Sequence, residues 1–385
     1  MSSKPSAAEL CAFLGEINYY EAAIYHMIED LVRFKPKNKQ ELKYAIGRSK
    51  NKIYHKDAIV RYGPIEIWNT ILIKDMSYLF GCSNDWTVPY WEFTRLNLTG
   101  WDVSNVTNME GMFKNSFYDL DTNFQNWDVG KVTNMSHMFY NQSHVFNAIL
   151  NGWDVSSVTD MSFMFFGCTH FNQPLDMWDV RKVETMESMF DLCELFNGDI
   201  SAWDVGNVKN MSHMFESCSM FNHPIGNWDV GNVNDMSFMF SDCCVFDQQL
   251  NNWKVSSVKN MAHMFAGCKQ FNQPIGNWDV ATVMTMGYMF DYCEQFNQPI
   301  GNWDVSNVKD MCKMFHNAMS FNQELGDWEI IQCNDFSNMF YGCVEFSKSL
   351  RTWKMYHSAH KYNMFDLKDI CYPDDWKPQL HTRQV

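Results

Sequence analysis

The sequence has little that would point to an enzyme or to a membrane protein. Although 46% of its 385 residues are apolar, no apolar run is long enough to cross a bilayer. A C-x-x-C pair, a phosphate-binding glycine loop, a nucleophile elbow and an EF-hand loop are also missing. These absences predict a chain with no membrane span, no metal, no other cofactor and no catalytic activity.

The N-terminus also has little of what a secretory signal requires. The apolar stretch of residues 11–17 is interrupted by Glu16, and no basic cluster precedes it. We therefore expect no classical secretion, and a location in the cytoplasm or in a virus particle assembled there.

What the chain does have is a tryptophan at a fixed interval. The intervals are 26, 26 and then 25 residues along Trp101, Trp127, Trp153, Trp178, Trp203, Trp228, Trp253, Trp278, Trp303, Trp328 and Trp353. Trp68 starts one more unit, with an insertion around Trp86 and Trp91 before the next. Self-similarity at such a period is typical of units that stack only on their neighbours. The spacing predicts about twelve stacked rungs.

Each rung has the same pattern when positions are counted from its tryptophan, which is position 0. The triplet Trp303, Asp304, Val305 alternates in polarity, as a half-buried strand does. Position 7 is a helix N-cap type in eleven units, followed by apolar residues at positions 8, 11 and 12. The pattern predicts an α/β repeat solenoid in which every rung has one short parallel strand and a short helical turn.

Cysteine is confined largely to one column. Position 15 holds Cys168, Cys193, Cys218, Cys243, Cys268, Cys293 and Cys343. Ala318 fills the same position in one unit, so we expect buried free thiols that act as small apolar groups. Disulfides between rungs and metal ligation are the alternatives.

The chain divides into four segments. A capping box at Ser6 and Glu9 predicts an amphipathic helix within residues 1–37, and Asn38 with Glu41 opens a basic helical cap over residues 38–67. The solenoid follows over residues 68–365, and residues 366–385 form a C-terminal cap or tail. Docking on a partner and dimerisation are the alternative roles for the N-terminal helices.

Two charged surfaces are candidate contact sites. Residues 1–67 hold 11 basic and 8 acidic residues, against 19 and 37 in the rest. The basic candidates are Lys35, Lys37, Lys39, Lys50 and Lys52. A candidate partner-binding stripe lies at position 1: Asp102, Asp128, Asp154, Asp179, Asp204, Asp229, Asp279 and Asp304. The alternative is that each aspartate caps its own turn, as D-V-S-N and D-V-G-N sequences do.

A histidine column at position 10 is the nearest approach to a catalytic array. His137, His213 and His263 share it with Phe163, Lys313 and other types. We interpret this tolerance as an exposed helical face with no carboxylate held beside the imidazoles. Catalysis there is not expected.

The repeat unit resembles a known family. W-D-V-S-N-V-T-N-M-x-x-M-F at residues 101–113 and F-N-Q-P-I-G-N-W at residues 271–278 and 296–303 are similar to BspA-like leucine-rich repeats. The tryptophan- and methionine-rich subgroup of mycoplasmas, protists and large DNA viruses is the nearest in pattern. The resemblance implies a leucine-rich-repeat-like solenoid that serves in recognition and has no common catalytic residues.

The function expected is therefore a non-catalytic protein–protein interaction scaffold. One alternative is a structural component of a large assembly, such as a minor capsid or bridging protein, and another is a surface adhesion protein. Partners would be other proteins, basic surfaces or copies of the chain itself. The acidic body disfavours nucleic acid.

Overall fold

The computed structural model describes residues 33–50, 55–81, 95–116, 119–120, 122–142, 146–356, 358–365 and 379–381. The predicted N-terminal helix lies outside these ranges except for residues 33–37. So do the insertion around Trp86 and most of the predicted C-terminal segment.

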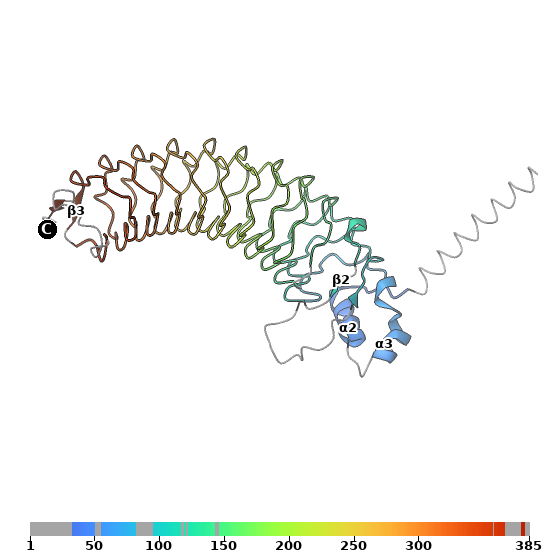
Figure 1. Cartoon of the computed structure of the whole chain (residues 1–385). Helices are drawn as coiled ribbons and strands as arrows, with labels where there is room; N and C mark the ends of the chain where they lie inside the picture. Colours follow the sequence, from blue (N-terminus) through green and yellow to red (C-terminus); the bar gives the residue numbers. More distant parts are fainter. Residues whose placement is uncertain are drawn as a thin grey trace, which may run out of the picture.

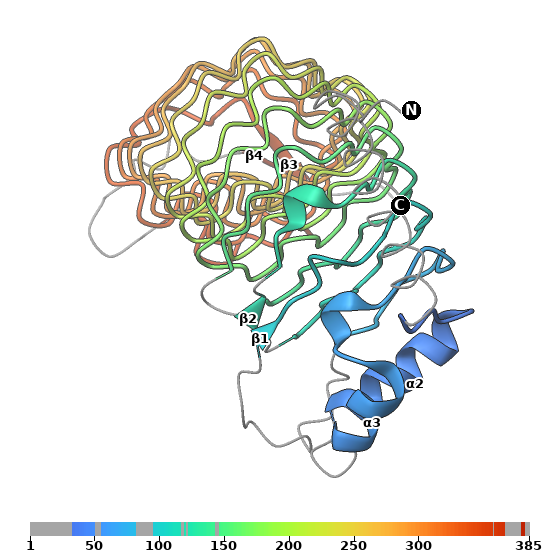
Figure 2. The same cartoon turned by 90° about the vertical axis from the view of Figure 1, so that its right-hand side faces the viewer.

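The units stack as coils in one curved row, which confirms a repeat protein (Figures 1 and 2). Each coil is joined to the next by a parallel bridge at position 7, from Asp75↔Asn108 through to Asp335↔His360. A segment of each unit therefore lies beside its equivalent in the next unit, at the same register.

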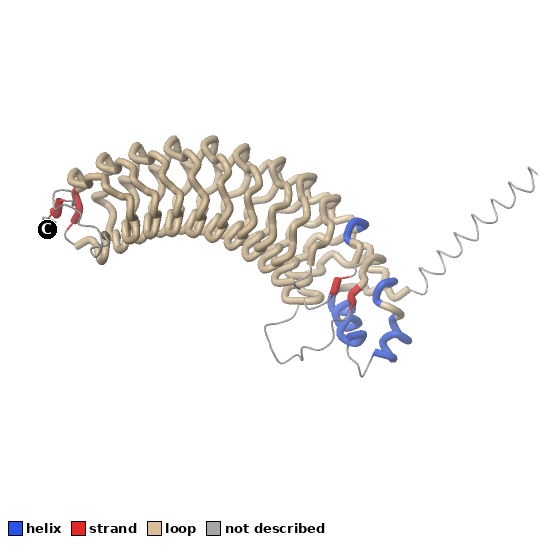
Figure 3. Tube along the Cα trace, in the orientation of Figure 1, coloured by secondary structure: helices blue, strands red, loops and turns tan. Residues whose placement is uncertain are grey.

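The predicted helical turn is wrong. Between Trp127 and Trp353 the described chain consists of turns without a helix (Figure 3). Position 10 has a left-handed backbone in every unit, with φ of 59° at His213, and position 14 is left-handed in most units. A left-handed residue ends a right-handed helix, so a run with one at every fourth position cannot become helical.

The backbone hydrogen bonds of this segment run to the next unit instead. Met211 donates to the carbonyl of Asp235 at 3.0 Å, and His213 donates to Ser237 at 2.8 Å. The amides between them close turns inside the unit, as Met214 does on Met211 at 3.2 Å. Every second amide is thus satisfied across the stack.

The predicted strand at Trp-Asp-Val forms only in the last unit. There β3 (Lys354–Tyr356) pairs in parallel with β4 (Gln379–His381), 25 residues further along. Two more short parallel strands, β1 (Arg95–Leu96) and β2 (Asp119–Leu120), lie near the start of the stack. Elsewhere neighbouring tryptophan rings are 6.2 to 6.4 Å apart, as for Trp203–Trp228 and Trp253–Trp278. In those units the tryptophan segments form no strand.

Unequal spacing also curves the stack. Ring centroids at position 10 are 4.1 Å apart for Phe238–His263, and those at position 12 are 5.7 Å apart for Phe240–Phe265. The tryptophan column is wider still. A stack that is narrower on one side bends toward that side, so position 10 lies on the concave face and the tryptophans lie nearer the convex one.

The core is a set of continuous columns of identical residues. The tryptophan, valine, methionine and phenylalanine columns are buried, and from Trp101 onward each indole of the column donates to a backbone carbonyl of the preceding unit, as Trp303 Nε1 does to Ile275 at 3.2 Å. The thiols of position 15 are buried and free, as predicted. Cys218 Sγ donates to the carbonyl of Phe190 at 2.9 Å. Each thiol therefore contributes a polar contact between units besides its packing.

Two helices and a short 3-10 turn cover the first rung. They are α2 (Lys39–Lys50), α3 (His55–Tyr62) and η1 (Ile65–Ile67); a second such turn, η2 (Phe124–Asn126), precedes Trp127. The Asn38 side chain accepts from the Glu41 amide at 3.0 Å, as the capping box predicts. The helix continues through Gly47 and ends at Lys50.

Candidate functional site

The concave face has a ladder of half-buried rings at position 10. His213, Phe238, His263 and Tyr288 stack with centroids 4.5, 4.1 and 4.2 Å apart, and the Lys313 ammonium lies 5.0 Å from the Tyr288 ring. Their backbones carry the left-handed φ described above, which turns these side chains out of the core. The ladder is an aromatic surface with one cation at its end.

Carboxylates border this ladder at positions 13 and 14. An open cavity of about 440 Å³ is lined by Glu216, Phe238, Ser241, Asp242, His263, Ala266, Gly267, Lys269, Asp291 and Tyr292. Asp291 Oδ1 contacts His316 Nδ1 at 2.6 Å, and the Lys269 ammonium contacts Glu294 at 3.4 Å. Within the described part of the chain, the Asp242 carboxylate has no hydrogen bond or ion pair. The cavity thus combines rings with an unpaired acid.

The electric field of this cavity favours a cation. Burial, and then the negative charges of Glu216 and Asp291, raise the pKa of Asp242, and the Lys269 ammonium offsets only part of this rise. A positive group entering the cavity would relieve that repulsion and stack on the Phe238 or Tyr292 ring.

One of the three histidines of position 10 has acids beside it, contrary to the sequence interpretation. His213 Nδ1 lies 2.5 Å from Glu216 Oε2, and Asp191 of the preceding unit completes the group. The three histidines are also half-buried rather than on an exposed helical face. The sequence contained a signal for this contact. Asp191 precedes His213 by 22 residues, three fewer than the repeat period, and stacking places residues that are about one period apart side by side.

Titration of this group follows from its surroundings. Burial and the nearby Glu216 raise the pKa of Asp191 to about 7. The hydrogen bond with Glu216 raises the pKa of His213. Burial lowers the pKa of both His137 and His263 instead. The group therefore holds protons more tightly than equivalent positions elsewhere.

The aspartate stripe at position 1 caps turns. Each of the eight aspartates accepts a hydrogen bond from the amide two residues on: Asp102, Asp128, Asp154, Asp179, Asp204, Asp229, Asp279 and Asp304, at 3.0 to 3.2 Å. The alternative interpretation is thus confirmed. Most of these carboxylates stay exposed, so partner binding by the stripe remains a prediction.

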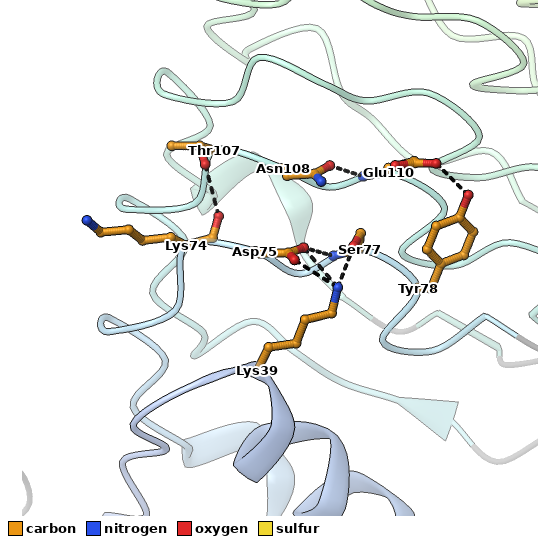
Figure 4. A network of polar contacts seen from close by, with 8 residues as sticks. All are labelled: Lys39, Lys74, Asp75, Ser77, Tyr78, Thr107, Asn108 and Glu110. Carbon is orange, nitrogen blue, oxygen red and sulfur yellow. Dashed lines mark hydrogen bonds and ion pairs between the residues drawn. The ribbon is translucent and has the colours of Figure 1, made fainter.

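The basic candidates have different surroundings. Lys39 Nζ contacts both Asp75 oxygens at 3.0 Å and the Ser77 hydroxyl, which ties α2 to the first rung (Figure 4). Lys35 and Lys37 are exposed. Lys52 and the side chain of Lys50 lie outside the described residues. Lys39 is therefore a structural contact of the cap.

Comparison with known families identifies the repeat. Five overlapping segments match the family described as "Mycoplasma protein of unknown function, DUF285": residues 50–119, 85–194, 114–222, 166–275 and 260–371. Because these segments span most of the chain, the protein belongs to this repeat family. Neither a curated protein nor a solved structure matches it.

No described helix is long and apolar enough to cross a membrane.

Proposed function

We propose that the chain is a non-catalytic protein-interaction scaffold whose concave face binds a basic segment of a partner protein. The stack would be a leucine-rich-repeat-like solenoid of the BspA type. The observation that carries the proposal is the cavity that Asp242, an acid with no hydrogen bond or ion pair among the described residues, lines together with the Phe238 and Tyr292 rings.

The chemistry of the cavity fits a lysine or arginine side chain. An ammonium or guanidinium group would pair with the Asp242 carboxylate, and its alkyl stem or planar group would cover a ring. The acidic body as a whole would attract such a segment over a longer distance and would speed its association. Shape supports the same surface, because a curved stack offers a partner an extended concave face.

Charge reversal tests the proposal with a matched control in the same unit. Asp242→Lys is expected to weaken binding of a fluorescein-labelled oligolysine peptide by about tenfold, roughly 1.4 kcal/mol, measured by fluorescence anisotropy. Asp229→Lys makes the same charge change on the position-1 stripe, where Lys254 shows that lysine is accepted. Binding should change much less in this control.

Equal weakening by the two variants would mean that only net charge matters, and a larger effect of Asp229→Lys would place binding on the stripe. Either result would refute the concave site.

Cross-linking in the native setting distinguishes the faces independently. Lys254 at position 1 and Lys269 at position 16 are exposed residues of one unit, and Lys269 lines the cavity. Cross-links to a partner from Lys269 without any from Lys254 are expected. The reverse pattern would contradict the proposal, and links from Lys269 to Lys35 or Lys37 would show that the partner is a second copy.

A further inference from the structure

Comparison within one column singles out His213. The residues at position 13 of the preceding and of the same unit are Lys114 and Tyr140 for His137, Asp191 and Glu216 for His213, and Ser241 and Ala266 for His263. All three imidazoles have the same left-handed backbone and the same half-buried setting. Among them, only His213 has a carboxylate at position 13 of both its own unit and the preceding one.

The donor atoms of this group converge. One atom each from Asp191, His213 and Glu216 lies within 4.8 Å of the others, and the three residues come from two adjacent units. Asp191 is 7% exposed, whereas the side chains of His213 and Glu216 are 34% and 25% exposed. The group therefore has a buried base and a side that is open to solvent.

Two carboxylates and a neutral imidazole carry two negative charges, one of them buried. A single proton shared by His213 and Glu216 leaves the Asp191 charge poorly compensated, and a divalent ion would neutralise the group. Imidazole nitrogen with carboxylate oxygen suits an ion of the zinc type, with ligands at about 2.0–2.2 Å. Donor atoms of such a tetrahedral site are about 3.4 Å apart.

We propose that Asp191, His213 and Glu216 form a binding site for a divalent ion of the zinc type. His213 Nδ1 and one oxygen of each carboxylate are the ligands, and the fourth position is open to solvent. Metal entry displaces the proton shared by His213 and Glu216, so binding releases a proton to the solvent. The ladder of rings beside His213 keeps the imidazole in place.

The site is tested by Zn²⁺ titration of the full chain in a calorimeter at pH 7.5, after accessible thiols are alkylated with iodoacetamide. The variants are His213→Gln, Asp191→Asn and the matched control His263→Gln, which lies in the same column two units further on. The native chain and His263→Gln are expected to bind one more equivalent of Zn²⁺ than the other two variants. Titration in buffers of different ionisation enthalpy should show proton release on binding.

Co²⁺ supplies a second readout that does not depend on stoichiometry. A visible d–d absorption typical of four-coordinate Co²⁺ is expected in the native chain and in His263→Gln, and it should be lost in His213→Gln. Equal Zn²⁺ stoichiometry and equal Co²⁺ spectra in all variants would overturn the site and leave the three residues as a proton-bridged ion pair. No partner protein is needed, so this result is separate from the test of the scaffold.

Discussion

At the residue scale, a column of equivalent positions serves one purpose in the core and another on the concave face. In the core, the column repeats one residue type, so each thiol meets an identical phenylalanine carbonyl of the unit before it, as Cys243 does on Phe215 at 3.0 Å. On the concave face the residue type varies from unit to unit. A group of interacting titratable side chains therefore forms only where two neighbouring units bring suitable residues together. Asp191 beside Glu216 is such a combination, and it has a cost for folding.

We expect Asp191→Asn to stabilise the metal-free chain at neutral and higher pH. The folded-state pKa of about 7 is above the unfolded value of 3.8, so the folded chain binds the proton more tightly and its stability falls as pH rises between those values. The gain in unfolding free energy over the native chain should be small near pH 4, grow to pH 7 and then stay constant, at a few kcal/mol in order of magnitude.

Urea unfolding in EDTA across this pH range measures the difference. A gain that is independent of pH would show that Asp191 is not protonated in the folded chain. Asp154→Asn, on the exposed position-1 stripe, is the control for the loss of one carboxylate.

At the scale of the element, the repeated turn depends on its left-handed residues. They break helical hydrogen bonding every fourth residue and direct alternate amides to the next unit. Glycine is needed in this segment only where a side chain of the preceding unit lies close to the glycine Cα. Gly267 at position 14, with φ of 72°, is such a place, because a Cβ there would lie 2.3 Å from Asp242 Oδ1.

Gly267→Ala is therefore expected to destabilise the chain by about 1–2 kcal/mol, the usual cost of a left-handed alanine. The control is Gly206→Ala at position 3, where φ is not left-handed and where Ala281 occupies the equivalent place. Its effect should stay within about 0.5 kcal/mol. Thermal unfolding of both variants measures their loss of stability. Equal losses in the two variants would mean that the left-handed backbone is not the cause of the destabilisation.

At the scale of the whole molecule, the stack is closed at its beginning by α2 and at its end by β4, with interchangeable units between. Stability is then a sum over units and the contacts between neighbours. Parallel contacts at position 7 join each unit only to the next, and buried columns run through all of them. A complete unit is thus the natural step in which length can change.

Deletion of residues 253–277 is expected to leave a folded chain with a modestly lower melting temperature. It removes one period and places Trp278 behind Trp228 with every column in register. Deletion of residues 253–264 removes half a period and sets polar residues in buried columns, so it should abolish cooperative unfolding. Circular dichroism during heating compares the two deletion variants. Similar unfolding curves would argue against the alignment of buried columns between units as the source of stability.

How much was predictable from the sequence differs between the core and the site. The turn-capping role of Asp304 was open to inference because the acceptor and the amide are two residues apart in the chain. The helical turn was inferred wrongly, since position-7 caps and an apolar spacing of three suit a helix and a left-handed turn equally well. The meeting of Asp191 with His213 escaped notice because it joins different units.

The sequence by itself determined the period, the number of units, the buried columns and the free thiols, because each follows from a residue type repeated at a constant interval. The tertiary structure decided where the units bond to one another, which way the stack bends and which side chains meet on the concave face. Those depend on the spacing between stacked side chains, whose ring centroids are about 4 Å apart beside His263 and about 6 Å apart beside Trp253. That spacing is set by packing along the whole stack rather than by any one repeat.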